Sequence, residues 1–270
     1  MKLIDHIINR IIVILLLAWC ADAAELPPAM TAKDLAAKLG ALQQDGSSYV
    51  RLTLDVKPPS GSPNIALQLQ IKQRRTVTAT EVIYQVIWPK ARAGEGVLLR
   101  QTAGQAASGS YFTPPDTLRP LTASQLKEPL FGSDLTFADV LENIFAWQQQ
   151  ALVGTEVVDR VSCQILESKP GNGQRSNYGS VRTWVDLRRM VPMRIEKYLS
   201  SGVLARRITT TRVSADDRQN RIPSDLMIVG ERADSATELK GSRINHAVSY
   251  AKETFTTLGL KDMSVPRSTD

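Results

Sequence analysis

The 270-residue sequence has few side chains of the kind that carry out chemistry, since it holds only two cysteines and two histidines. His246 lies in RINHAVSY, which offers no metal-ligand spacing, and Cys163 lies in VSCQIL, where its place among strand residues indicates a small buried hydrophobe. The chain lacks G-x-S-x-G, P-loop, H-E-x-x-H and calcium-loop motifs. Asp216 and Asp217 stand among polar turn residues, where we expect both to be solvated. The sequence therefore predicts a protein that is not an enzyme and uses no metal or cofactor.

Apolar stretches are also short. The run IIVILLLAW, Ile11–Trp19, has nine residues, whereas a membrane-spanning helix needs about 20. Positive residues precede this run, and the small residues Ala21 and Ala23 follow it at the −3 and −1 positions of a cleavage site. This pattern predicts a signal peptide over residues 1–23, cleavage after Ala23 and export to the periplasm.

A lipid anchor at Cys20 is the first alternative, because a lipoprotein signal also ends in a cysteine. Trp19 directly precedes Cys20, and a bulky indole fits poorly where a small residue is expected. An uncleaved N-terminal anchor is the second alternative. Cleavage after Ala23 would leave Cys163 as the only thiol and would exclude an intrachain disulfide.

The formal net charge of +6 is modest. A basic surface can attract lipid headgroups or nucleic acid, but export argues against nucleic acid as a partner. The charge is spread along the chain, which favours the simpler interpretation that it serves solubility.

The remaining chain alternates between turn clusters and period-two stretches. We expect an amphipathic helix over residues 31–44, a second over 134–146 and a short one near 252–257. Residues 102–133, rich in glycine, serine and proline, interrupt the pattern. Strands are predicted over residues 50–56, 65–71, 76–88, 96–101, 149–158, 162–168, 181–187, 193–199 and 203–213, with two shorter ones near 225–232 and 237–243.

These elements predict a mainly β (α+β) fold. It is a half-open, curved antiparallel β-sheet or barrel of about ten strands, with helices covering the concave face. Such a sheet would enclose a cavity, although a filled sandwich shows the same alternation. An all-β chain of this length commonly forms one domain. We therefore expect a monomeric domain over residues 24–265 and a frayed tail over 266–270.

Two segments resemble the outer-membrane lipoprotein-sorting proteins of the LolA-like superfamily. The first is FGSDLTFADVL, residues 131–141, and the second is VRTWVDLRRMVPMRIEKYLSSGVLARRI, residues 181–208. Members of this family often show a G-S-D segment followed by an aromatic and an acidic residue. Later they show a strand that ends in W-x-D, a turn, a proline and a strand that runs to Tyr and Gly. The matching positions here are Gly132, Ser133, Asp134, Phe137, Asp139, Val140, Trp184, Asp186, Pro192, Glu196, Tyr198 and Gly202.

The resemblance implies a half-open β-barrel with a helical lid over an apolar cavity, and a function as a periplasmic carrier. The cargo would be acyl chains of lipoproteins or other lipids, passed from an inner-membrane exporter towards an outer-membrane acceptor. The chain departs from the family pattern at Ser200-Ser201, where an acidic residue is expected before Gly202. A different class of function stays open. In it, the same fold is a sensor or accessory subunit of a lipid or lipoprotein export system and binds a partner protein.

Apolar residues on the expected strands and helices are the candidates for lining the cavity, although each could equally belong to an ordinary core. Arg182 and Arg194 could meet a phosphate headgroup, with plain surface placement as the alternative. The lining candidates are Leu35, Leu52, Leu54, Leu67, Leu69, Val86, Trp88, Leu99, Phe137, Leu141, Ile144, Trp184, Met193 and Ile195.

Overall fold

The computed structural model describes residues 30–43, 46–59, 62–174, 176–230, 234–241 and 244–269. Residues Ala32–Asp270 form one compact unit. The expected signal peptide, its cleavage site and Cys20 lie outside the described residues. In the described part of the chain, no helix is both long enough and apolar enough to span a membrane.

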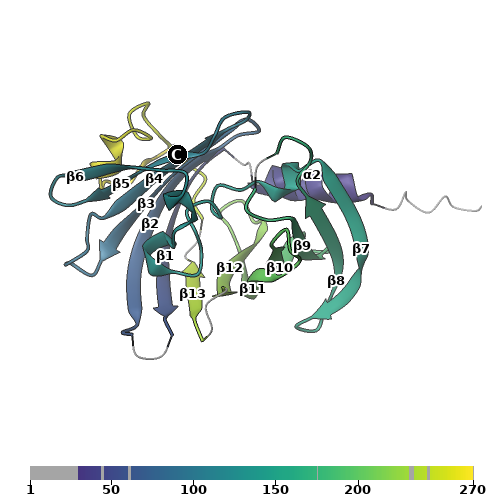
Figure 1. The fold of residues 1–270 in the computed structure, drawn as a ribbon. Coiled ribbons are helices and arrows are strands. Elements are labelled where there is room, and N and C mark those ends of the chain that lie inside the picture. Colours follow the sequence, from purple (N-terminus) through teal and green to yellow (C-terminus); the bar gives the residue numbers. More distant parts are fainter. Residues whose placement is uncertain are drawn as a thin grey trace, which may run out of the picture. The chain divides into compact units, whose positions relative to one another are not determined.

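Thirteen strands of the described chain form one antiparallel sheet, and the helix α2 (Ala32–Gln43) precedes them (Figure 1). The strands of the first half are β1 (Gly46–Lys57), β2 (Ile65–Arg75), β3 (Ala79–Trp88), β4 (Gly96–Thr102), β5 (Ser108–Thr113) and β6 (Thr117–Leu121). Those of the second half are β7 (Gln149–Val158), β8 (Val161–Lys169), β9 (Ser180–Asp186), β10 (Val191–Tyr198), β11 (Leu204–Ala215), β12 (Arg221–Val229) and β13 (Ala236–Gly241).

The sheet consists of two meanders, β1–β6 and β7–β13, in which each strand pairs with its successor in the chain. The meanders join where β1 pairs with β13, so that Leu52–Lys57 lies against Ala236–Gly241. The edge strands β6 and β7 do not pair with each other, and the sheet is not closed.

The prediction of one large antiparallel sheet is confirmed, but the expected count of about ten strands was too low. Two additional strands, β5 and β6, come from residues 102–133, where glycine and Pro120 disguise the alternation. Pro120 is tolerated because β6 is an edge strand, whose outward N–H groups need no partner in the sheet.

The two further helices that the sequence predicted do not form. Residues 134–146 hold only a 3-10 turn, η3 (Ile144–Ala146). Asp139 accepts hydrogen bonds from the N–H and the hydroxyl of Thr136, both at 2.8 Å, as at the start of a helix. It also pairs with Lys197 and Arg206 of the sheet, and these tertiary contacts override the local helical preference. The expected helix over 252–257 is replaced by turns and by the 3-10 turn η4 (Gly259–Lys261). The predicted cover of several helices was therefore wrong, and α2 is the only α-helix in the described ranges.

Residues 122–148 connect β6 to β7 and therefore link the two edges of the sheet (Figure 1). We call this fully described segment the strap. It contains three isolated 3-10 turns, η1 (Gln125–Lys127), η2 (Leu130–Gly132) and η3. None of its helical segments is longer than these turns.

Cross-strand partners define the face that the strap covers, which we call the strap face. Directly opposite residues lie on the same face of a sheet, so a row of partners can be followed from strand to strand. Thr237 of β13 donates to Asp134 of the strap at 2.8 Å, which places its row on the strap face. The row crosses the eight strands from β8 to β2 through Leu166, Thr183, Ile195, Ile208, Ile228, Thr237, Val56 and Ile65.

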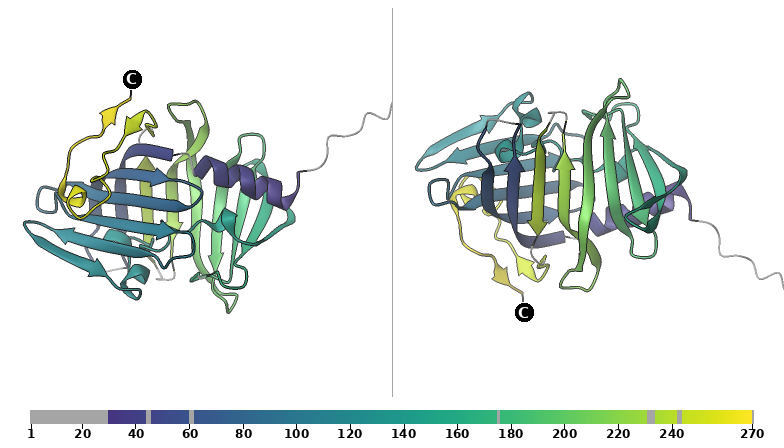
Figure 2. Two further views of the ribbon diagram at one scale, coloured as in Figure 1. Left: turned by 90° about the horizontal axis from the view of Figure 1, so that it is seen from above. Right: turned by 90° about the horizontal axis from the view of Figure 1, so that it is seen from below.

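The opposite side of the sheet, the back face, is covered in the first meander by the C-terminal segment, residues 244–269, drawn in yellow in Figure 2. Phe255 and Leu260 pack against aliphatic and aromatic residues of β3, β4 and β5. Gln85 donates to the Leu260 carbonyl at 2.8 Å, and Lys72 donates to the Asp262 carbonyl at 2.7 Å. The segment is thus fixed by apolar contact and by side chains that bind its backbone.

The last described residues are paired rather than free. Arg267 and Ser268 form the short strand β15, which lies antiparallel to β14 (Val248–Ser249). Thr269 also donates its N–H to the Ala247 carbonyl at 3.0 Å. The backbone of the segment that we expected to fray therefore has partners up to Thr269.

Candidate functional site

An apolar interior lies between the strap and the first meander. The strap contributes Leu126, Leu130, Phe131, Phe137 and Leu141, which pack on strap-face aliphatic residues of β1–β4. Leu52 packs against this cluster while keeping part of its surface exposed. Seven of the predicted lining residues belong to the cluster, each at most 3% exposed: Leu54, Leu67, Leu69, Val86, Leu99, Phe137 and Leu141.

A second set of strap-face aliphatic residues is only partly covered. Leu226 and Leu239 are cross-strand partners beside Leu54, and Ile195 and Ile208 are partners on β10 and β11. We call these four residues, Ile195, Ile208, Leu226 and Leu239, the half-buried group, since each has intermediate exposure. The apolar surface of the strap face therefore continues beyond the part that the strap seals.

Three predicted lining residues lie elsewhere. Trp184 is the cross-strand partner of Arg194 and directly follows Thr183, so its side chain lies on the back face. Met193, at a register shift in β10, packs with Trp184 in a separate cluster. These two residues cannot share a cavity with Leu54, because the sheet lies between them. Trp88, at the end of β3, is 52% exposed.

The helix α2 lies at the end of the strap. It packs against η3, β7 and β8 with a buried stripe that includes Leu35 and Leu39. Gly40 belongs to the same stripe, and a Cβ at this position would lie 3.6 Å from the Cβ of Phe145 in η3. The remaining lining candidate, Ile144, is 5% exposed in this turn.

The G-S-D motif anchors the strap to the middle of the sheet. Asp134, 3% exposed, accepts hydrogen bonds from the hydroxyls of Ser235 and Thr237 at 2.7 and 2.8 Å. Its N–H donates to the Thr237 hydroxyl at 2.9 Å. Gly132 has a φ of +86°, and a Cβ there would approach Ile65 to 3.1 Å, so the motif needs glycine at this position.

The acidic residue of the same segment lies in a buried ion cluster. Asp139 has a 1% exposed side chain, accepts from Lys197 and from the Tyr178 hydroxyl, each at 2.7 Å, and forms an ion pair with Arg206. Glu142 adds a second carboxylate 3.3 Å from Lys197. Burial alone would raise the pKa of Asp139, but the charges of Lys197 and Arg206 hold it well below its usual range.

The next residue of the strap is held from the other meander. The Arg75 guanidinium, at the end of β2, donates to the Val140 carbonyl at 2.8 Å. Two consecutive strap residues, Asp139 and Val140, thus bind cations from β10, β11 and β2. Sequence reasoning identified Asp139 only as a motif position, because its partners lie about 60 residues further along the chain.

The second motif builds a hairpin and its turns. Asp186 ends β9 and accepts the N–H groups of Arg188 and Arg189 at 3.0 and 3.3 Å. Pro192 of β10 lies opposite Val185 of β9, and Tyr198 is the last residue of β10. Gly202, with a φ of +83°, forms the turn to β11. These motif positions therefore lie on or next to β9 and β10, which pair directly.

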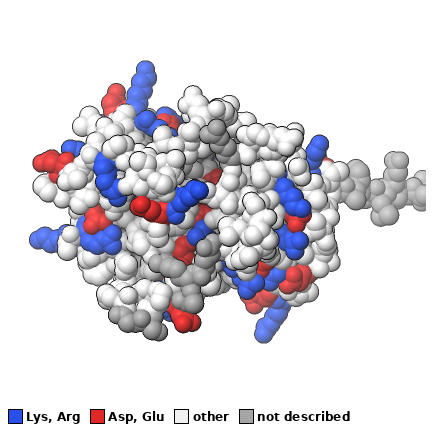
Figure 3. Space-filling model, in the orientation of Figure 1, with Lys and Arg blue, Asp and Glu red and all other residues white. Residues whose placement is uncertain are grey.

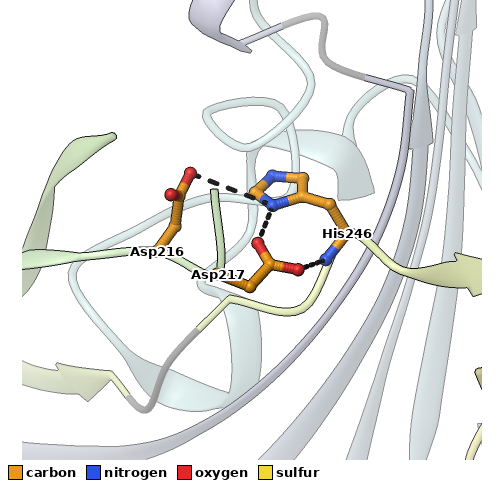
Figure 4. A group of neighbouring side chains, drawn as sticks. All are labelled: Asp216, Asp217 and His246. Atoms are coloured by element: carbon orange, nitrogen blue, oxygen red, sulfur yellow. Dashed lines mark hydrogen bonds and ion pairs between the residues drawn. The ribbon is translucent and has the colours of Figure 1, made fainter. Parts of the chain in front are cut away.

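Asp216, Asp217 and His246 form a group whose ligand atoms lie within 4.8 Å of one another (Figure 4). Asp217 accepts the His246 N–H at 2.6 Å and lies 2.6 Å from the ring Nδ1. Asp216 accepts the N–H of Asn220 at 2.8 Å. We expected Asp216 to be solvated, but it is 3% exposed, because the turn between β11 and β12 uses it as an acceptor. The group fastens this turn to the C-terminal segment.

Replacing His246 with alanine should lower the free energy of unfolding by about 1–2 kcal/mol. Burial raises the pKa of Asp217, but its hydrogen bonds with His246 outweigh this effect and lower the pKa overall. This contribution to stability is therefore present above the pKa of an unfolded aspartate and is lost as the pH falls through the lowered value. Urea unfolding of the wild type and the variant at pH 7 and pH 3 would measure both effects. An equal difference at the two pH values would contradict the role of Asp217.

The two arginines considered for a phosphate headgroup already have acidic partners. Arg182 pairs with Glu167 at 2.9 Å and Arg194 with Glu156 at 2.8 Å. Arg194 also stacks over the Trp184 ring on the back face, 3.8 Å from its centroid. Figure 3 shows basic and acidic side chains interspersed on one face of the molecule. The charge of each arginine is therefore already balanced by a carboxylate.

A family model described as an uncharacterised protein family matches residues 43–262, the segment that forms all thirteen strands and most of the C-terminal segment. The chain belongs to this family. No curated protein sequence matches it.

Several solved structures of other proteins have the same fold as this chain. A DUF1329 family protein from Desulfovibrio piger has a TM-score of 0.77 at 18% identity, with 85% of this chain and 97% of that chain covered. A protein from Vibrio parahaemolyticus, whose name assigns it to the outer membrane lipoprotein-sorting protein domains, has a TM-score of 0.76 at 15% identity, with 86% and 98% covered. A LolA superfamily protein from Nitrosomonas europaea has a TM-score of 0.67 at 17% identity, with 86% and 100% covered. The LolA-like resemblance predicted from the two motifs is confirmed, and at these identities it concerns the fold.

Proposed function

We propose that this protein is an exported carrier that binds the acyl chains of lipoproteins or other lipids between the strap and the strap face. The observation that carries the proposal is the way in which the strap is attached. Among the described residues, every backbone–backbone hydrogen bond of the strap stays within the strap. Its polar ties to the sheet involve side chains, among them those of Asp134, Asp139, Glu142, Arg75 and Gln150. The strap can therefore leave the sheet without breaking a strand ladder.

Displacing the strap would uncover the strap-face side chains of β1–β4. An acyl chain could then occupy this surface, and each buried methylene would contribute about 0.8 kcal/mol. The half-buried group extends the same apolar surface next to the covered part, which offers a place where a chain could first make contact. Release would follow when the strap returns or when an acceptor binds the chain more tightly.

The export predicted from the sequence would fit a transfer between membranes. The proposal takes residues 1–23 as a signal peptide and places the protein in the periplasm, with an inner-membrane exporter as donor and an outer-membrane acceptor as recipient. It assigns no enzymatic step, and the name of the similar Vibrio parahaemolyticus protein refers to lipoprotein sorting. In this role the strap takes the place of the helical lid that the sequence predicted.

Native mass spectrometry of the full chain, expressed with its own N-terminus and purified from a bacterial periplasm, tests the proposal. We expect a fraction of the molecules to carry the mass of a lipid or lipopeptide, and the polypeptide itself to begin at Ala24. A lipid-free protein that also fails to take up added fatty acids or lipopeptides would exclude the carrier function. An acylated Cys20 would exclude release from the membrane.

One observation favours the accessory-subunit alternative. The edge strand β7 is exposed along nearly its whole length, including Val153 and Val157 at 46% and 66%. It carries no lysine, arginine or proline of the kind that usually blocks an edge, whereas the other edge, β6, has Arg119 and Pro120. A strand from a partner protein could pair with β7. A lipid-free preparation that retains a membrane complex in the same experiment would support this alternative.

A further inference from the structure

Arg75 lies where the apolar part of the strap face ends. Along β2, three aliphatic residues and Gln73 precede it at every second position, so all of them lie on the strap face. Ile71 belongs to the cluster under the strap, Gln73 is polar, and Arg75 ends the strand below Val140 of the strap. Along β2 the strap face therefore changes from apolar at Ile71, through the polar Gln73, to cationic at Arg75.

The Arg75 side chain is half-buried, and its hydrogen bonds within the described chain go to neutral acceptors. It donates to the Val140 carbonyl at 2.8 Å and, through Nε, to the Gln73 side chain at 3.4 Å. A guanidinium has five N–H donors, so it has donors to spare. Lys197 and Arg206, the cations on the other side of the strap, both pair with Asp139. Burial lowers the pKa of Arg75, which fits a cation without a counter-charge.

Other polar groups lie at the same end of the face. Tyr84, the cross-strand partner of Ile71, is a partly buried residue that packs against the apolar cluster. Burial raises its pKa, and the charge of Arg75 acts against this rise, so the two groups are close enough to interact. The Tyr84 hydroxyl is protonated at neutral pH and can donate a hydrogen bond. Gln73 in turn donates to the Ser48 hydroxyl at 2.6 Å, which fixes its oxygen towards Arg75.

From this arrangement we propose that the ligand is an amphiphile with an anionic head, a carboxylate or a phosphate, which the Arg75 guanidinium binds while the chain lies on the strap face. The inference rests on the proposed function and defines the class of its ligand. The Tyr84 hydroxyl would supply a second donor to the head. A carboxylate or phosphate accepts two parallel N–H bonds from a guanidinium, which a single carbonyl cannot do.

Binding of the head would also loosen the strap. A head that binds both terminal nitrogens of the Arg75 guanidinium would compete with the Val140 carbonyl for Nη2, and the charged acceptor forms the stronger bond. An anionic head would thus displace Val140 from Arg75 and remove one of the strap's ties to the sheet. Asp139, the next residue, would keep its own partners on β10 and β11. The ligand would therefore release the end of the strap that faces β2.

The test compares dodecanoate, dodecyl phosphate and dodecanol, which share one chain length and differ in the head. Their dissociation constants for the delipidated full chain would be measured by isothermal titration calorimetry at pH 7.5. We expect both anionic ligands to bind at least about tenfold more tightly than the alcohol, as a charge-assisted bond predicts. Arg75→Met should abolish this preference and Arg75→Lys should keep part of it. The matched control Arg74→Met, on the back face and paired with Glu81, should leave the preference unchanged.

Other outcomes would distinguish a wrong role for Arg75 from a wrong proposed function. Equal binding of the acid and the alcohol to the wild type would overturn the role of Arg75 and leave acyl-chain binding intact. An equal loss of affinity for acid and alcohol in Arg75→Met would reduce Arg75 to an anchor of the strap. Binding of acetate or inorganic phosphate alone as tightly as the amphiphiles would mean a free-anion site and would also overturn the inference. Failure of all three amphiphiles to bind would instead contradict the proposed function itself.

Discussion

Replacing Asp139 with asparagine should lower the free energy of unfolding by about 3–5 kcal/mol, since it leaves Arg206 without its carboxylate partner and Lys197 with only Glu142. Lys197 and Arg206 have side chains only 6% and 11% exposed, and Asp139 pairs with both. In a domain of this size, each kcal/mol corresponds to about 2–4 °C in Tm. We therefore expect a loss on the order of 10 °C, measurable by differential scanning calorimetry together with urea unfolding.

The matched control for this variant is Asp225→Asn. Asp225 pairs with Arg212, whose side chain is 57% exposed, and such a surface pair contributes about 0–1 kcal/mol. The low pKa of Asp139 fixes the pH dependence: its contribution is present above the pKa of an unfolded aspartate, about 3.9, and declines as the pH falls below it. The difference in the free energy of unfolding between the wild type and Asp139→Asn should therefore become smaller only at acidic pH. Similar losses in the Asp139 and Asp225 variants at pH 7 would show that the ion cluster does not hold the strap.

Replacing Leu226 with glutamate should weaken the binding of a fluorescent fatty acid by at least about tenfold. Leu226 is a strap-face residue of the half-buried group, and its partner Leu239 lies beside Leu54 of the apolar cluster. An acyl chain that contacts this surface would have to desolvate the new carboxylate, which costs several kcal/mol. Because Leu226 is already partly exposed, the free protein should tolerate the charge. Fluorescence titration gives the affinity, and circular dichroism checks the fold.

Met227→Glu provides the control for this second variant. Met227 is the next residue of β12, has similar exposure, and lies opposite Thr209 and Glu238 on the back face. It should bind the fatty acid as the wild type does. Equal losses in the two variants would show that the strap face is not the binding surface.

Much of the sheet was predictable because its strands are half-buried. In β1 and β2 the alternation of Leu52 and Leu54, and of Leu67 and Leu69, follows the pleat directly. The same alternation places Arg75 on the apolar face of β2, so the sequence already contained the signal for this half-buried cation. The predicted strand ended at Ile71, whereas β2 continues to Arg75, so the prediction left Arg75 out.

The strap and the assignment of faces could not be predicted in this way. Residues 134–146 have a helical pattern of apolar residues, but their partners come from β2, β10, β11 and β13, which are distant in sequence. Trp184 and Met193 alternate correctly along their strands, yet alternation does not say which face of a sheet is covered by the strap. A register shift near Pro192 further obscures the phase in β10.

The pairing of β1 with β13 has a consequence for when the protein can fold. Within each meander, every strand finds its neighbour in the chain nearby, so each half can assemble from local contacts. The seam between the halves pairs Leu52 with Gly241 and Lys57 with Ala236, and it cannot form until almost the whole chain has been synthesised. The complete sheet, and with it the row that crosses both halves, must therefore arise late. A chain organised in this way stays without its finished apolar face during synthesis.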